Sequence, residues 1–200
     1  MVKFYDIATG KPLNFSVEHT LPINEINLNQ VEQTLERKLA FLDVNKDLYI
    51  TTVYRTEKNE KIAAICDSFL WHDKYDVLVS VADSKLSTLF YPNIAFIDEK
   101  LQTMTTTVKE VPELGRLPQI VNYYETQVTI RRRDGGVVTV ANSPYPTILL
   151  DFCEKGKWEK ATKLCRFVKE HLLWACLAAA SLKQKKLESA ETAFAVIEEP

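Results

Sequence analysis

The chain has 200 residues, of which 46% are hydrophobic and 26% charged, and its formal net charge is −2. That length suits one domain or two small ones, and the composition is typical of a chain that buries a sizeable core without disulfides or metals. A slightly negative chain without a Lys/Arg stripe between its aromatic residues is not expected to bind nucleic acid.

Alternating apolar and polar residues dominate the chain up to about residue 142, and β-branched and aromatic residues crowd into short runs there. This alternation predicts half-buried β-strands. A turn-rich stretch from Asp6 to Pro12 follows the first of them. The predicted strands cover residues 2–5, 23–28, 38–42, 48–54, 62–65, 69–72, 77–81, 86–91, 94–97, 119–123, 128–132 and 137–141.

The last two predicted strands are joined by a short hairpin that contains Asp134 and Gly135. Asp-Gly accepts the backbone conformation of a tight β-turn. Just before it stand Arg131, Arg132 and Arg133, the one dense basic spot of the chain. We interpret these arginines as a solvated strand end.

The strand pattern repeats along the chain. Residues 42–50, 81–89 and 122–130 each show a strand, a polar turn and a second strand. A period of about 40 residues with four strands per unit is the signature of a β-propeller blade. An antiparallel β-sandwich also gives regular short strands, and we favour the propeller. The sequence thus predicts WD40-like blades over residues 1–142, about three in number, which is fewer than a closed propeller needs.

The period changes after Ser143 and Pro144, because the apolar residues then recur at helical spacing. Residues 143–200 are therefore predicted to form the first helices of a tetratricopeptide-like solenoid. Too few blades and too few helical repeats are present for either module, so we expect the chain to be a piece of a longer protein. The predicted helical faces contain Ile148, Leu149 and Phe152; Trp158, Ala161, Leu164, Cys165 and Val168; Leu173, Cys176, Leu177 and Ala180; and Leu187, Ala190, Phe194 and Ile197.

The longest apolar run, Leu172 to Leu182, is too short to span a bilayer, so it predicts a buried helix and no membrane insertion. The four cysteines are far apart and form no CxxC pair, which favours a reducing compartment. Asn14 matches a glycosylation acceptor pattern, which we ascribe to chance.

No catalytic, cofactor-binding or metal-binding residue is predicted. Asp43 to Asp47 begins like a calcium loop, but Leu48 and Tyr54 replace the Gly and Glu that such a loop requires. Cys165 and Cys176 fall on apolar helix faces, where burial makes a thiol inert. The three histidines, His19, His72 and His171, are scattered along the chain, and His72 is expected to be a hydrogen-bonded rim residue. Trp158 and Trp174 are expected in the core, and the alternative is a hot spot for a partner protein.

The region around residues 128–198 also resembles a known family. The resemblance lies in the segment from Val128 to Arg132, in Asp134-Gly135 and Ser143 to Leu149, and in the helical segments at 157–170, 174–179 and 190–191; it is looser upstream, at residues 2–6, 24–30 and 91–93. The family is the eighty-kilodalton subunit of the intraflagellar transport B complex. Lys183 to Lys186 and Gln102 to Leu117 diverge from it.

The resemblance implies the last blades of a second WD-type propeller followed by the start of a helical solenoid. It implies a non-catalytic scaffold in the cytoplasm and cilium, at the ciliary base and axoneme, that supports cilium assembly through contacts with other intraflagellar transport B subunits. It leaves open a homodimer of the full-length protein and does not assign partner-binding residues. Two alternatives are a vesicle-coat subunit, which also joins a propeller to a solenoid, and, more remotely, a thiol enzyme on a β-rich scaffold.

Overall fold

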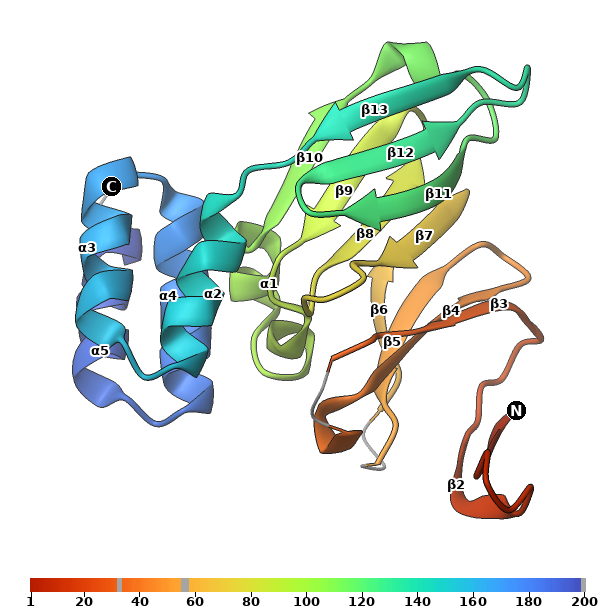
Figure 1. Ribbon diagram of the computed structural model, residues 1–200, viewed down its shortest axis with the longest axis horizontal. Coiled ribbons are helices and arrows are strands. Elements are labelled where there is room, and N and C mark those ends of the chain that lie inside the picture. The colour runs from red at the N-terminus through yellow and green to blue at the C-terminus, as the bar shows by residue number, and fades with distance from the viewer. Residues whose placement is uncertain (32–33, 55–57, 199–200) are drawn as a thin grey trace.

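The computed structural model describes residues 1–31, 34–54 and 58–198. In this part of the chain, four antiparallel sheets follow one another and lead into a group of helices on one side (Figure 1). The strands are β1 (Val2–Tyr5) and β2 (Pro12–Val17); β3 (Ile23–Leu28), β4 (Lys38–Asp43), β5 (Leu48–Thr52) and β6 (Glu60–Ala63); β7 (Ser68–Trp71), β8 (Leu78–Ala82), β9 (Lys85–Leu89) and β10 (Thr106–Glu110); and β11 (Gln119–Tyr124), β12 (Gln127–Arg131) and β13 (Val137–Ala141).

Each sheet is a meander in which consecutive strands pair, as in a propeller blade. Neighbouring blades meet through their first strands, because β7 packs against β3 on one side and against β11 on the other. The Trp71 indole N–H reinforces this contact by donating to the Asn27 carbonyl oxygen at 3.1 Å. The sequence prediction of an incomplete propeller joined to helices is therefore confirmed.

Two details of the strand prediction are wrong. Residues 94–97 are not a strand; most of them lie in the 3-10 helix η2 (Pro92–Phe96), where the Ile94 N–H bonds to the Tyr91 carbonyl oxygen at 3.0 Å. Pro92 favours this turn because its ring fixes φ and removes a ladder donor. The second error is the third repeat. Residues 42–50 and 81–89 join the second and third strands of their blades, whereas residues 122–130 join β11 to β12, the first and second strands of theirs.

An insertion explains the faulty repeat. Between β9 and β10 the chain forms η2 and the short helix α1 (Glu99–Met104), so the counterpart of the two earlier hairpins is the β12–β13 hairpin. The Asp98 carboxylate caps α1 by accepting from the Lys100 N–H at 2.8 Å. The prediction missed α1, β2 and β10, and it also missed a second 3-10 turn, η3 (Pro112–Leu114), which follows β10.

The helical part consists of α2 (Tyr145–Glu154), α3 (Trp158–Val168), α4 (His171–Lys183) and α5 (Leu187–Glu198). Residues 173–181 of α4 are all buried, because α2, α3 and α5 surround the helix and α1 of the propeller packs against it as well. This agrees with the buried helix predicted from its apolar run. None of the helices in the described ranges is long and apolar enough to cross a membrane.

The largest of three hydrophobic clusters among the described residues runs from the blades β7–β10 and β11–β13 into the helices. Val79 of β8, Val128 of β12, Leu149 of α2 and Leu173 of α4 all belong to it, and all four are inaccessible to solvent. The change from strands to helices between Ala141 and Tyr145 is therefore a packed seam and not a free linker.

The shared core can be tested by shortening one buried side chain. Leu177→Ala should lower the free energy of unfolding by about 2–5 kcal/mol, because Leu177 is inaccessible and a cavity would remain. Leu187→Ala is the matched control and should cost below about 0.5 kcal/mol, since Leu187 is 70% exposed. Urea unfolding followed by circular dichroism measures both, and equal losses in the two variants would contradict the shared core.

Candidate functional site

The residues weighed for chemistry do not assemble into a reactive centre within the described part of the chain. His19 lies 3.4 Å from a carboxylate oxygen of Asp43 and packs on two aromatic rings, while His72 lies in another blade and His171 is exposed at the start of α4. The described residues contain no group of three or more His, Cys, Asp or Glu side chains that could hold a metal ion.

Asp43 acts as a turn residue. One of its carboxylate oxygens accepts from the Asn45 N–H at 2.9 Å and from the Asp47 N–H at 3.0 Å. Burial alone would raise the pKa of Asp43, but these bonds and the His19 contact outweigh it and hold the pKa below its ordinary value. The calcium-loop pattern is thus the polar turn between β4 and β5 that the sequence favoured.

His72 directly follows the end of β7 and is hydrogen-bonded, as predicted, and its side chain is buried. Its Nε2 lies 2.9 Å from the Glu125 carbonyl oxygen, and its Nδ1 accepts from the Lys74 N–H at 3.0 Å. The ring also stands edge-on to Tyr123 at 4.6 Å between centroids. His72 therefore connects the blade formed by β7 to β10 with the β11–β12 turn.

All four cysteines are free and buried. Burial raises the pKa of Cys66, Cys153 and Cys165 to about 12, and it raises the pKa of Cys176 as well. A thiol of this kind carries almost no thiolate at neutral pH and is a poor nucleophile. Burial thus argues against the thiol-enzyme alternative.

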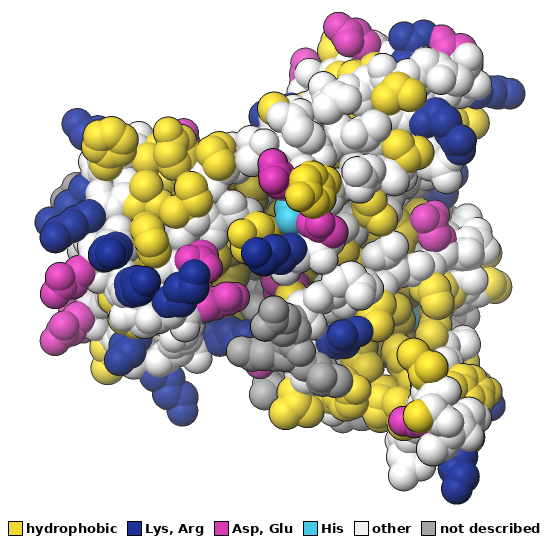
Figure 2. Space-filling model, viewed as in Figure 1, with side chains coloured by type: hydrophobic (Ala, Val, Ile, Leu, Met, Phe, Trp, Pro, Cys, Tyr) yellow, Lys and Arg dark blue, Asp and Glu magenta, His cyan; other side chains and the backbone are white. Residues whose placement is uncertain are grey.

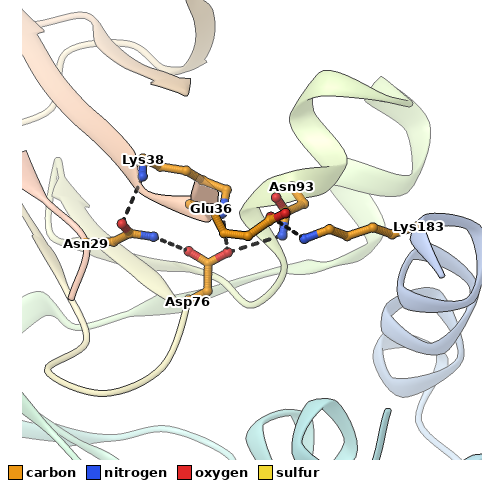
Figure 3. A network of polar contacts seen from close by, with 6 residues as sticks. All are labelled: Asn29, Glu36, Lys38, Asp76, Asn93 and Lys183. Atoms are coloured by element: carbon orange, nitrogen blue, oxygen red, sulfur yellow. Dashed lines mark hydrogen bonds and ion pairs between the residues drawn. The ribbon is translucent and has the colours of Figure 1, made fainter. Parts of the chain in front are cut away.

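The most organised polar cluster lies where two blades and the helices meet (Figure 3). We call it the polar junction, and its residues are Asn29, Glu36, Lys38, Asp76, Asn93 and Lys183. The Lys38 ammonium lies 2.6 Å from the Asp76 carboxylate and also donates to the Glu36 carbonyl oxygen at 3.2 Å. The lysine side chain is only 1% exposed and that of Asp76 is 17% exposed, so this ion pair is largely desolvated.

Two asparagine side chains also donate hydrogen bonds to the Asp76 carboxylate. The Asn29 amide donates to one carboxylate oxygen at 2.8 Å, and the Asn93 amide donates to the other at 3.2 Å. Asn29 in turn accepts from the Lys38 N–H at 2.8 Å. The carboxylate thus connects the β3–β4 segment, the β7–β8 loop and η2, and a fully hydrogen-bonded pair of this kind fixes the arrangement of the elements that supply it.

The helices join the junction through one further contact. The Lys183 ammonium at the end of α4 lies 2.5 Å from the Glu36 carboxylate. Beside it is a hollow of about 350 Å³ that both apolar and charged side chains line. The hollow is lined by Leu35, Glu36, Lys38, Thr52, Asn93, Phe96, Ile97 and Lys183.

Sequence reasoning did not find the junction. One signal was available, because Lys38 stands directly before the apolar run Leu39 to Leu42 of β4. A lysine that is buried with such a strand needs a partner. Nothing in the sequence identified Asp76, Asn93 or Lys183 as the groups that meet it, since they lie 38 or more positions away.

Comparisons with known proteins give matches over the whole chain. Residues 1–145 match the family described as IFT80 second beta-propeller. The chain is 38% identical over 204 aligned residues to proteins named Intraflagellar transport protein 80 homolog from Mus musculus and from Rattus norvegicus. In both comparisons the alignment covers all of this chain and 26% of the relative. The chain thus spans about a quarter of the length of these curated relatives.

The polar junction generates a prediction for stability. Asp76→Ala should lower the free energy of unfolding by about 3 kcal/mol, because it leaves the Lys38 ammonium buried without its carboxylate. Lys183→Ala should cost less than about 1 kcal/mol, since both partners of that pair are partly exposed. Urea titration of the two variants and the unmodified chain measures the difference. A cost of Asp76→Ala no larger than that of Lys183→Ala would show that the junction does not hold the blades.

Thiol chemistry supplies a second prediction. In the native chain at pH 8, a thiol-reactive dye should label all four cysteines slowly, because a pKa near 12 leaves a thiolate fraction on the order of 10⁻⁴. The rate should rise steeply when urea unfolds the chain and exposes the thiols. One cysteine that reacts quickly in the native state would restore the enzyme alternative.

Proposed function

The chain belongs to the IFT80 second beta-propeller family, and from this membership we propose that it serves as a non-catalytic scaffold segment of an intraflagellar transport protein. Its role is to hold binding surfaces in fixed relative positions within the intraflagellar transport B complex, whose other subunits are its partners. It works in the cytoplasm and cilium, at the ciliary base and along the axoneme, where the assembly supports cilium construction.

The observation that carries the proposal is the 38% identity along the entire chain, which continues beyond the propeller into the helices. The packing supports a scaffold in particular. Because α4 is enclosed by the other helices and by α1 of the propeller, the helices pack directly against the propeller. The high pKa values of the buried thiols support the absence of catalysis.

We further propose that the chain divides into blades over residues 1–142 and solenoid helices over residues 143–200, joined by a packed seam. This division assigns the partner contacts of the two parts to different surfaces. A vesicle-coat subunit remains the second candidate, since propellers and solenoids are also combined there, but no feature of this chain favours it over the transport role.

The test is recovery of the complete protein from ciliated cells. A tagged full-length version should co-purify with subunits of the intraflagellar transport B complex, as identified by mass spectrometry. Leu177→Ala, which damages the shared core, should reduce this recovery, whereas the exposed Leu187→Ala should not. Recovery with Golgi or endosomal coat proteins in place of transport subunits would overturn the proposal.

A further inference from the structure

A second surface lies on the β12–β13 hairpin, at the end of the blades remote from the helices (Figure 1). A hollow of about 350 Å³ opens there, and three consecutive arginines form much of its wall. Lys and Arg side chains stand out over this end of the molecule in Figure 2. The residues that line the hollow are Leu117, Gln119, Arg131, Arg132, Arg133 and Gly135.

The arginines of the hollow are only partly balanced by carboxylates, because Asp134 and Glu113 both act on Arg132. Arg132 pairs with Asp134, and this contact lowers the pKa of Asp134. Arg131 donates to the neutral amide of Gln119, which faces it in the paired strand. Within the part of the chain that the structure describes, Arg133 has no ion-pair partner. The hollow therefore carries surplus positive charge.

The equivalent turn of another blade differs in this respect. At the β4–β5 turn, Lys46 lies 2.7 Å from Asp67, and Lys61 lies 2.5 Å from Asp47. Each basic side chain there has a carboxylate partner from the same sheet or from the start of the next blade. The β12–β13 turn thus departs from a pattern in which the blade neutralises its own cations.

The hairpin holds these groups in place. The Arg132 N–H donates to the Gly136 carbonyl oxygen at 2.7 Å, and the Gly136 N–H donates to the Asp134 carboxylate at 2.9 Å. Gly135 adopts φ +86°, which a residue with a side chain rarely does. A turn fixed in this way holds the backbone from which the arginines project, so binding has to order their side chains but not the turn.

Guanidinium groups bind carboxylates with two parallel hydrogen bonds, which is why arginine is common at sites that recognise acidic groups. We propose that this hollow binds a Glu- or Asp-rich segment of a partner protein, with Arg131 and Arg133 as the contacting cations and Leu117 as an apolar wall. Nucleic acid is disfavoured, because the lining contains no aromatic side chain on which a base could stack. This inference does not depend on the proposed transport role.

The test uses fluorescently labelled hexaglutamate as the probe and measures its anisotropy with the 200-residue chain at 50 mM salt. Binding should weaken steeply at 300 mM salt, since exposed charges are then screened. Arg133→Ala should weaken binding about tenfold, and Arg133→Lys should retain part of it. Arg166→Ala, at an exposed arginine on α3, is the matched control and should bind like the unmodified chain. Circular dichroism of each variant verifies folding.

Three further probes decide between outcomes. Hexaglutamine should not bind, and a phosphoserine peptide or a single-stranded oligonucleotide should bind no more tightly than hexaglutamate. Tighter binding of either would overturn the assignment to a carboxylate-rich protein segment. No binding of hexaglutamate below 1 mM, or equal binding by Arg133→Ala and the unmodified chain, would overturn the site itself.

Discussion

The structure depends on one constraint, which is that α4 is apolar on every side and must be covered on every side. A helix of this kind has no solvent face, so it needs more neighbours than a two-helix hairpin can supply. Here the additional cover comes from α1, a helix inserted in a propeller blade. The hydrophobic effect that buries α4 therefore joins the helices and the two blades nearest to them, β7–β10 and β11–β13, into one core. The relative position of these parts follows from packing.

Apolar packing alone does not fix how the first blade is oriented relative to the helices. The polar junction supplies this orientation. Apolar side chains tolerate small shifts, whereas the Lys38–Asp76 pair and its two asparagines are satisfied only in one arrangement. A desolvated ion pair adds little net stability compared with apolar residues of the same size. Removing one of its two charges is nevertheless costly, because the other charge then stays buried without a partner. The junction is thus best understood as a device that selects one orientation of the first blade relative to the helices.

The sequence predicted those strands and helices whose residues show a clear local pattern. Strand alternation located most of the strands. The apolar face predicted from Trp158 to Val168 lies on α3, because its residues recur at helical spacing. The insertion of η2 and α1 was missed, because a short helix capped by Asp98 has too few residues to show a period. That insertion then shifted the third repeat by one strand. Beyond the signal at Lys38, the partners in the junction could not be predicted, since they depend on which distant loops the propeller topology brings together.

The two ends of the blades serve different physical roles as a result of this topology. The connections that follow the first strand of each blade, such as the β3–β4 and β7–β8 segments, face the helices and form the junction. The hairpins between the second and third strands lie at the opposite end, remote from α2 to α5 (Figure 1). A polar group at the covered end must find a partner within the chain, because it is removed from water. A polar group at the other end is not removed from water in this way, so an arginine such as Arg133 can stand there without a carboxylate partner in the described part of the chain.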